Sequence, residues 1–298
     1  MLEGININTG KAICFFASYF KGETIPYYIK VYLQELKKYF PELIFLVSNE
    51  KIAENDLTFL SQNNISLQKE KNEGYDFGMW YKAMQHHDIS NYETVAFVND
   101  SSVLFSSLTK FVSWAATEKA DVLGMTESYS VSHHIQSYFL WFKKPALPFV
   151  KDYFQKQGIQ KDLDSVIKVY EIGLSTEILN KGLKIAAFVS NNDYKGEFAP
   201  YYHCIDSHLL QGIPMIKKKI VYSSYRQDEL LSLARMNFKM DVKHYYDVMA
   251  QSPDLIIDLN KLRADQALEF SEWDVFKYNV KRFFINAFRP IYKLVKGK

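Results

Sequence analysis

The first hundred residues alternate between short apolar runs and longer segments with helical periodicity. The apolar runs predict strands at residues 12–18, 43–49, 65–68 and 94–98. Between them, apolar side chains recur every three or four positions, which predicts helices at residues 25–40 and 52–61 and another that begins near Asp76. Runs that are apolar on both faces are typical of strands buried between helices, so this alternation predicts a mostly parallel α/β sheet flanked by helices.

The pattern loosens after residue 111. Further strands are expected at residues 121–125, 138–142 and 185–189, and further helices at residues 145–156, 165–181, 228–236 and 242–249. The length of 298 residues suits one large domain with an appended region. We place the α/β domain at residues 1–225 and a helical C-terminal region at residues 226–298.

Polar residues follow several of the predicted strands. The residues at these strand ends are Ser18, Asn49, Asn99, Asp100 and Ser101. In open α/β sheets, ligands bind beyond the carboxyl ends of the strands. We therefore expect these side chains at one edge of the sheet, together with the segment around Asp76.

That segment, NEGYDFGMWYKAMQ at residues 72–85, carries an aspartate between two glycines at the start of a helical pattern. Asp76 can be an N-cap whose carboxylate accepts N–H groups of the first turn. It can also be held there to meet a ligand, with the glycines letting that ligand approach the backbone. The segment alone leaves both interpretations open.

Other short motifs have a functional and a structural interpretation. Asp100 can bind a divalent cation or lie in a strand-ending turn. Glu171 can be a general base at a pocket rim or a solvated helix acid. His133, His134 and Gln136 can bond a polar ligand or lead into a core strand, and adjacent histidines in a strand face opposite sides, so they form no metal pair. Singly, each motif is more typical of ordinary structure; together at one edge they favour a ligand site.

Charge and composition limit the function further. The formal net charge is +2, but the stretch from Val275 to Lys298 carries seven Lys or Arg and no acid. A basic, aromatic, amphipathic tail predicts attachment to an anionic membrane surface. Nothing indicates nucleic-acid binding, because the rest of the chain has more acids than bases. Two distant cysteines, no signal peptide and no apolar stretch of about 20 residues predict a cytoplasmic protein.

From about Ser48 to Lys218 the chain resembles the rhamnan synthesis protein F family, glycosyltransferases of bacterial cell-surface polysaccharide assembly. The matching segments, in order, are SNE, NEGYDFGMWYKAM, VNDSSVLF, GMTES, HHIQSYFLWFKK, YEIGLSTEILNKGLKI and GIPMIKK. The resemblance implies a GT-A-like, Rossmann-type fold that binds a nucleotide sugar. The acidic Asp-x-Asp metal motif of that fold is reduced here to Asn99-Asp100-Ser101. A divalent cation, Mn²⁺ or Mg²⁺, held by Asp100 and His208, is therefore an open expectation.

The resemblance also implies roles for single residues. The expected donor-binding residues are Ser18, Asn49, Asn72, Gly74, Tyr75, Asp76, Asn99, Asp100, Ser101, His134, Gln136 and Lys217. Asp100 would stabilise the leaving diphosphate, and Glu171 or Glu127 would deprotonate the acceptor, with Glu171 preferred.

The implied reaction moves a sugar, rhamnose by the family name, from a nucleotide sugar to a growing lipid-linked glycan. Together with the basic tail, this predicts a peripheral protein on the cytoplasmic face of the cell membrane. The alternative is a catalytically silent scaffold that binds glycan or nucleotide within a polysaccharide synthesis complex.

Overall fold

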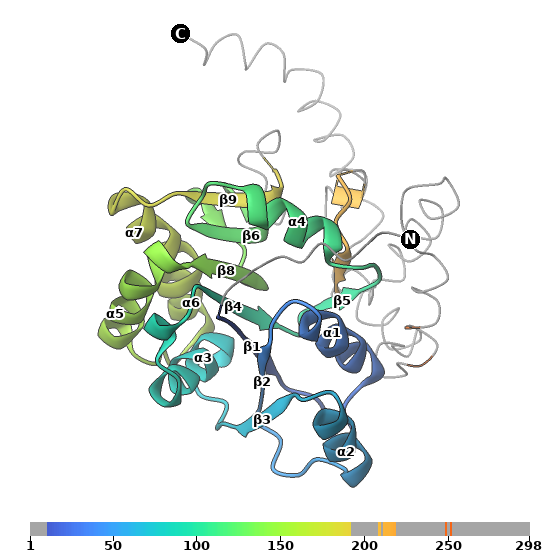
Figure 1. Cartoon of the computed structure of the whole chain (residues 1–298). Coiled ribbons are helices and arrows are strands. Elements are labelled where there is room, and N and C mark those ends of the chain that lie inside the picture. The colour runs from blue at the N-terminus through green and yellow to red at the C-terminus, as the bar shows by residue number, and fades with distance from the viewer. Residues whose placement is uncertain (1–10, 192–207, 210, 219–247, 249–250, 252–298) are drawn as a thin grey trace, which may run out of the picture.

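The computed structural model describes residues 11–191, 208–209, 211–218, 248 and 251, which form a sheet with helices on both faces (Figure 1). Eight strands make the main sheet in the order β3-β2-β1-β4-β8-β6-β7, with β9 paired to β6, and β10 pairs with β5 in a separate ribbon. The strands are β1 (Ala12–Ser18), β2 (Glu42–Val47), β3 (Ser66–Lys69), β4 (Thr94–Asn99), β5 (Ser102–Leu104), β6 (Val122–Ser128), β7 (His134–Ile135), β8 (Phe139–Lys143), β9 (Ile185–Val189) and β10 (Met215–Lys217).

The first four neighbouring strands are parallel. Ile13 of β1 lies opposite Glu42 of β2 and Val95 of β4, and Ile44 of β2 lies opposite Ser66 of β3. The order 3-2-1-4 is that of a Rossmann-type sheet. Parallel neighbours need a crossover segment, and α1, α2 and α3 supply the three that are required. The expected fold class, a GT-A-like Rossmann-type sheet flanked by helices, is confirmed.

The helices follow the strands in the manner of a doubly wound fold. They are α1 (Tyr27–Lys37), α2 (Glu54–Gln62), α3 (Tyr75–His86), α4 (Thr109–Thr117), α5 (Leu147–Gln157), α6 (Leu163–Val166) and α7 (Leu174–Asn180), with a π-helical segment (Ile167–Gly173) and two 3₁₀ turns (Ile89–Asn91 and Lys144–Ala146). The chain thus covers both faces of the sheet along most of its width (Figure 1).

The second half of the sheet is mixed. β8 runs antiparallel to both β4 and β6, whereas β9 is parallel to β6. The sequence pattern did not predict this reversal. Its cause is the short connection from β6 through β7 to β8, because a parallel return needs a crossover of a dozen or more residues. As a result, the carboxyl ends of β6 and β9 lie at the same edge of the sheet as those of β1 and β4.

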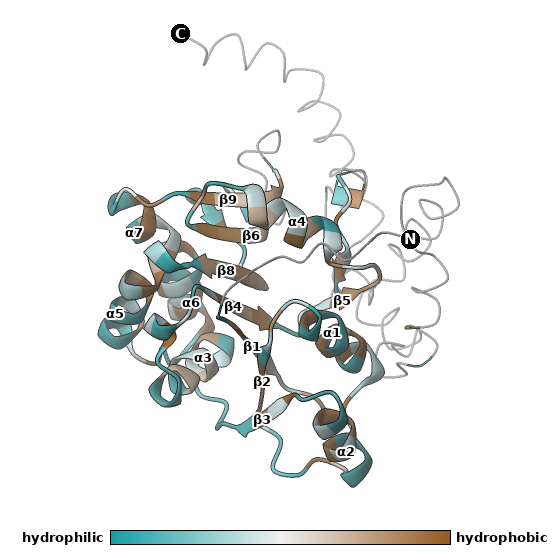
Figure 2. Cartoon of the chain, viewed as in Figure 1, coloured by the Kyte–Doolittle hydropathy of each residue, from teal (hydrophilic) through white to brown (hydrophobic). Residues whose placement is uncertain are grey.

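Two hydrophobic cores lie on the two faces of the sheet. Along β1 the side chains alternate: Cys14 and Phe16 pack in the core under α1 and α4, and Ile13 and Phe15 in the core under α3 and α5. Figure 2 shows the apolar strands between helices whose outer faces are polar. Burying one such side chain stabilises the fold by about 1.5–3 kcal/mol, so this fully buried central strand is a main determinant of the architecture.

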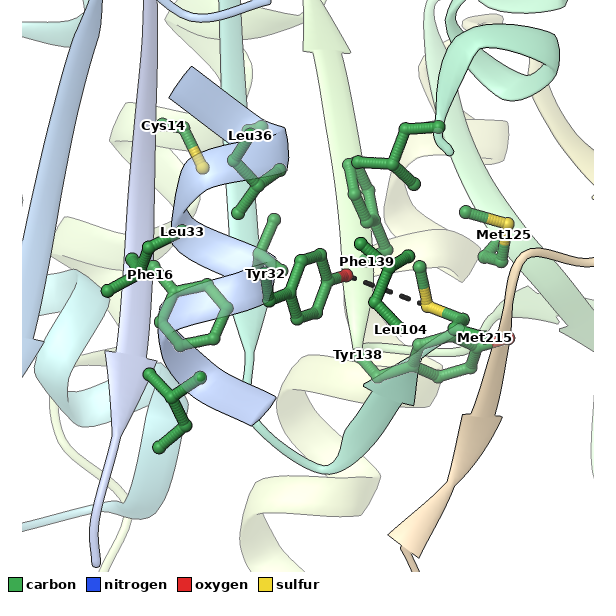
Figure 3. Packing of buried hydrophobic residues seen from close by; sticks show 14 of the residues in the cluster. Cys14, Phe16, Tyr32, Leu33, Leu36, Leu104, Met125, Tyr138, Phe139 and Met215 are labelled. Carbon is green, nitrogen blue, oxygen red and sulfur yellow. Dashed lines mark hydrogen bonds between the residues drawn. The ribbon is translucent and has the colours of Figure 1, made fainter. Parts of the chain in front are cut away.

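The ribbon of β5 and β10 packs onto the first of these cores. The Tyr32 hydroxyl on α1 donates to Met215 Sδ on β10 at 3.6 Å (Figure 3). Both side chains are fully buried, among Leu104 of β5 and Tyr138. This packing fixes β10 beside the end of β4, and therefore fixes where the basic residues that follow Met215 lie.

Most of the predicted elements are confirmed within a few residues, and 12–18 and 185–189 match the strands at both ends. The predicted helix at 165–181 is instead α6, a π-helical segment and α7 in succession. Four elements were not predicted: β5, α4, β7 and β10. Three of these are only two or three residues long, too short for a periodic signal.

Some predictions lie outside the described residues. They include the helices at 228–236 and 242–249, the division at residue 225 and the basic amphipathic tail. Within the described part of the chain, no helix combines the length and apolar character needed to cross a bilayer.

Candidate functional site

Polar side chains gather beyond the carboxyl ends of the parallel strands, as the sequence predicts. Ser18 ends β1, Asn99 ends β4 and Glu127 lies one residue from the end of β6. All three are buried although each carries a polar side chain. Buried polar groups are costly unless they are paired, so their partners indicate what this edge is built to do.

Asn99 links the Asp76 segment to the end of β4. Its amide nitrogen donates to Asp76 Oδ2 at 2.6 Å, and its Oδ1 accepts from the backbone N–H and the hydroxyl of Ser101, at 3.1 and 2.6 Å. The turn interpretation of Asn99-Asp100 is therefore correct, and the turn also positions Asp76. The capping interpretation of Asp76 is wrong: the N-cap of α3 is Gly74, and no side chain caps the helix.

Asp100 lies in an ion pair that joins β4 to the basic end of β10. Lys218 Nζ is 3.0 Å from Asp100 Oδ2, and the Tyr28 hydroxyl donates to the same oxygen at 3.2 Å. Lys217 Nζ donates to the Ser101 hydroxyl at 3.3 Å and lies 4.2 Å from the ring centre of Tyr138. The structure thus brings two lysines and a carboxylate together at the sheet edge.

The charges of this cluster act on Asp76. Burial raises the pKa of Asp76 to about 7, and the negative charge of Asp100 acts in the same direction. The hydrogen bond from Asn99 and the charges of Lys217 and Lys218 oppose this rise. Asp76 is therefore a carboxyl group that titrates near neutral pH, which is typical of functional sites.

A cavity of about 160 Å³ adjoins this cluster. Its wall consists of Ser18, Tyr19, Asn72, Tyr75, Asp76, Phe77, Met79, Ser137, Leu163, Val166 and Glu171. Five of the residues predicted from the sequence, including Glu171, thus line one cavity. The Ser18 hydroxyl is buried without a hydrogen-bond partner among the described residues, so it is available to a molecule in the cavity.

The backbone that leads into α3 is strained. Gly74 has φ 77° and Tyr75 has φ 57°, a left-handed conformation that non-glycine residues seldom adopt. A Cβ at Gly74 would lie 2.7 Å from Ile159 Cγ2, and one at position 78 would lie 1.7 Å from the Glu73 carbonyl oxygen. The close approach of neighbouring segments therefore explains the glycines at positions 74 and 78. The strained conformation of Tyr75 places its half-exposed ring at the cavity.

Glu171 reaches the cavity from the π-helical segment. Such wide turns occur mostly as single insertions within α-helices, often at functional sites. The Tyr153 hydroxyl donates to the Val169 carbonyl at 2.7 Å, which satisfies a backbone acceptor in the wide turn. A Cβ at Gly173 would lie 2.9 Å from the Tyr153 hydroxyl, so glycine is required there.

Glu127 lies in a separate network. Its carboxylate accepts from His133 Nε2 at 2.7 Å, from the Ser190 hydroxyl at 2.8 Å and from the Asn191 backbone N–H at 3.2 Å. Burial by itself raises the pKa of Glu127, but the hydrogen bonds from His133 and Ser190 outweigh burial and leave that pKa lowered. His208 joins this network through a 2.7 Å hydrogen bond with Asn191 Oδ1.

The remaining predicted residues have structural partners. Asn49 donates to the carbonyls of Phe20 and Gly22 and so holds the loop after β1. His134 Nδ1 is 2.8 Å from the Ser132 carbonyl oxygen. Gln136 accepts from the Thr126 hydroxyl, which also bonds the Tyr138 hydroxyl, whose ring lies under Lys217. Of these residues, Gln136 is the one connected, through this chain of contacts, to the lysine pair.

A divalent cation finds an incomplete donor set here. Among the described residues, no group of three His, Cys, Asp or Glu side chains could hold a metal. The carboxylate of Asp100 is neutralised by Lys218, and His208 contacts Asn191 in the other network. Mg²⁺ can bind through one or two carboxylates plus substrate phosphates, so Asp76 and Asp100 would need a phosphate ligand to complete a site.

The sequence did not single out several residues of this edge. Tyr28 and Lys218 bond Asp100, and Ser137 lines the cavity. The run of three lysines at residues 217–219 carried a signal, because a lysine can neutralise a phosphate group. Tyr28 carried no such signal. Helical periodicity predicts that Tyr28 lies on the core face of its helix, but it does not predict the partner of the hydroxyl.

The fold and this edge define the class: an α/β protein of Rossmann type with a charged ligand site beyond the carboxyl ends of its strands. The family model for rhamnan synthesis protein F matches residues 44–263. The chain therefore belongs to the rhamnan synthesis protein F family, as the sequence motifs indicate. This membership supports a glycosyltransferase-like function.

A curated relative is the uncharacterized protein y4gN of Sinorhizobium fredii, which is 26% identical over 159 residues. The match spans 50% of this chain and 42% of that protein, so the chain covers less than half of its relative.

Three solved structures resemble the fold at low identity. The 4-diphosphocytidyl-2C-methyl-D-erythritol synthase of Anaerococcus prevotii is 12% identical with a TM-score of 0.42, over 63% of this chain and 91% of that one. A putative nucleotide-diphospho-sugar transferase of Desulfovibrio desulfuricans is 15% identical, with a TM-score of 0.41 over 59% and 79%. The mannosyltransferase PcManGT of Pyrobaculum calidifontis, solved with GDP-Man and Mn²⁺, is 9% identical, with a TM-score of 0.41 over 92% and 80%. All three TM-scores lie below 0.5, so these structures do not define the site of this protein.

Proposed function

We propose that the protein is a glycosyltransferase that moves a sugar from a nucleotide sugar onto a growing, lipid-linked bacterial cell-surface polysaccharide. The supporting observation is the cluster of Asp76, Asn99, Asp100, Lys217 and Lys218 beside a cavity at the carboxyl edge of the sheet, in a chain of the rhamnan synthesis family. The family description favours rhamnose as the sugar. The enzyme class would be that of the hexosyltransferases.

In this proposal the diphosphate of the donor lies against the two lysines. During transfer, an acceptor hydroxyl attacks the anomeric carbon, the bond from that carbon to phosphate breaks, and the diphosphate leaves with the electron pair. Stabilising the charge that develops on the leaving group is the main electrostatic task. Lys217 and Lys218 supply two positive charges, and Asp100 holds Lys218 in place at 3.0 Å.

The sugar of the donor would lie in the cavity. Asp76 and Glu171 offer carboxylates, and the Ser18 hydroxyl offers an unpaired donor, to the sugar hydroxyls. The half-exposed ring of Tyr75 gives one apolar wall. Binding pockets commonly combine an apolar wall with a few polar groups, and together these orient a polar ligand such as the donor sugar.

The direct test is turnover of a panel of nucleotide sugars by the purified protein. We expect release of nucleoside diphosphate from one donor, and loss of that release in Asp100→Ala. Asp152→Asn, an exposed aspartate on α5, is the matched control and should keep full activity. Tight donor binding without turnover across the panel would instead identify a catalytically silent scaffold.

The membrane location is a separate proposal that rests on the sequence of the basic tail. Seven Lys or Arg without an acid between Val275 and Lys298 would attract an anionic leaflet, at about 1 kcal/mol for each residue near the surface. The test is co-sedimentation with liposomes of the full chain and of a chain truncated after Phe270. Binding that requires anionic lipid and is lost on truncation supports the proposal; equal binding by both chains contradicts it.

A further inference from the structure

The Glu127 network has the geometry of a carboxylate–histidine pair rather than that of a free carboxylate. Glu127 was expected as a direct general base, but its side chain is 8% exposed. Both of its oxygens already accept hydrogen bonds, one from His133 and the other from Ser190 and Asn191. A buried carboxylate with both oxygens occupied is poorly placed to reach an acceptor hydroxyl.

His133 has the exposure that Glu127 lacks. Its side chain is 30% exposed, and its ring stacks on Tyr129 with ring centres 4.4 Å apart and planes 6° apart. Nε2 lies 2.7 Å from Glu127 Oε2. An ionised carboxylate accepts and cannot donate, so this contact places the proton on Nε2 and leaves the Nδ1 lone pair to accept one.

The neighbours of the ring fit this assignment. Burial and the charge of Glu127 raise the pKa of Tyr129 to about 12, so the phenol stays neutral and adds no charge beside the imidazole. The lowered pKa of Glu127 keeps the carboxylate ionised at neutral pH. His208, the other titratable group of the network, is separated from Glu127 by Asn191.

The Glu127–His133 pair also lies at the edge of the sheet that carries the cavity. β8 is antiparallel to both β4 and β6, so β6 runs in the same direction as β4 and β1. Glu127, one residue from the end of β6, and Asn99, at the end of β4, therefore lie at the same edge. The segment that carries His133 continues through β7 to Ser137, which lines the cavity. The chain of contacts through Gln136, Thr126 and Tyr138 connects the two parts of the edge.

We propose that His133 is the catalytic base that takes the proton of the acceptor hydroxyl, and that Glu127 is a positioning residue that fixes its tautomer. This rests on the transferase function proposed above. As the acceptor oxygen bonds the anomeric carbon, its proton passes to Nδ1 and the diphosphate departs with the electron pair. The imidazolium beside the Glu127 carboxylate later releases the proton to water.

The kinetic test compares His133→Gln, Glu127→Gln and Glu171→Gln with a matched control, His86→Gln, whose side chain is 66% exposed at the end of α3. We expect His133→Gln to lower kcat by about 10²–10³-fold, as for loss of a general base, with the donor KM changed less than about threefold. Glu127→Gln should lower kcat about tenfold and move the acid limb of the pH profile to lower pH, because the imidazolium loses its charged neighbour. A merely structural role would not move that limb.

The outcomes separate the two proposals. A wild-type kcat and an unchanged acid limb in His133→Gln would overturn the assignment while leaving the transferase function intact. Loss of the acid limb in Glu171→Gln but not in His133→Gln would do the same. An absence of turnover by the wild-type protein with every donor would overturn the transferase function itself. NMR of ¹⁵N-histidine-labelled protein gives an independent readout: a proton on His133 Nε2 supports the pair, and one on Nδ1 contradicts it.

Discussion

Two carboxylates at the same edge of the sheet have opposite environments. Asp76, beside β4, is half-buried near another negative charge, and its pKa is raised to about 7. Glu127, near the end of β6, is buried, but three hydrogen bonds to its carboxylate lower its pKa. Partial or full burial is thus common to both, and the number of hydrogen-bond donors decides the direction. Groups at one site whose pKa values are pushed apart are typical of a division into different chemical roles.

The lysine pair belongs to the Asp76 side of this contrast and should show the largest effect. Lys218→Ala removes a positive charge from the proposed diphosphate site and leaves Asp100 bonded to Tyr28. We expect kcat/KM for the donor to fall about 10²–10³-fold, comparable to loss of one preorganised group that stabilises a transition state. Steady-state release of nucleoside diphosphate measures this.

Its matched control is Lys119→Ala, an exposed lysine outside the site, which should remain within about twofold of the wild type. Equal kinetics in Lys218→Ala and Lys119→Ala would show that the lysine pair is not the diphosphate site.

Asp76→Asn should separate function from stability. We expect transfer to fall about 10²-fold while the fold is retained, because asparagine still accepts the hydrogen bond from Asn99. The pKa of Asp76 is raised in the folded protein, so ionisation opposes folding increasingly as pH rises from about 4 to about 7. The variant should therefore be more stable than the wild type at pH 8 and similar at pH 4.

Thermal unfolding at the two pH values checks this prediction. A variant that is less stable than the wild type at pH 8 would mean that the Asp76 carboxylate stabilises the fold, contrary to the expected sign.

Glu127→Gln should show the reverse dependence. The folded-state pKa is lowered, so the carboxylate contributes stability above its ordinary pKa of 4.5, and this contribution is lost as pH falls through the lowered value. We expect a loss of about 1.5–3 kcal/mol at pH 7, the range for hydrogen bonds to a charged group, and a smaller difference in acid. Denaturant unfolding measures it, with the exposed Glu54→Gln as control.

Removal of metal should have the smallest effect. Because the carboxylate of Asp100 is paired with Lys218, we expect the lysines rather than a cation to carry the diphosphate. We expect turnover in EDTA to stay within about threefold of that with Mn²⁺ or Mg²⁺. A loss restored by either ion would assign a cation to Asp76 and Asp100, completed by donor phosphates.

The sequence predicted the parallel half of the fold better than the mixed half. The strands at 12–18 and 94–98 are uniformly apolar and lie between amphipathic helices, so local pattern and tertiary burial agree. β5, β7 and β10 have two or three residues each, and long-range pairing alone creates them. The antiparallel β8 depends on the length of a connection, which hydrophobic periodicity does not report.

The site was predicted in part for a similar reason. Strand ends are local features, so Ser18, Asn99 and Asp100 were found from the chain pattern. The partners of these residues come from distant segments: Asp100 lies 118 positions from Lys218. Asp76 was singled out by its two glycines, yet its bond to Asn99 could not be known without the fold. The pairing of His133 with Glu127 likewise depends on the turn between β6 and β7.

The π-helical segment gives the cavity wall an unusual sensitivity to chain length. Removing one residue between Ile167 and Gly173 would return the wide turn to a regular α-helix. The wide turn accommodates one residue more than a regular α-helix, so such a deletion would leave the buried faces of α6 and α7 aligned and would shift the residues within the turn. Leu174 and Ile178 would stay in the core, whereas Glu171 would move relative to the cavity. The position of Glu171 is therefore encoded by an insertion, and deletions rather than substitutions are the changes that would most readily remodel this wall.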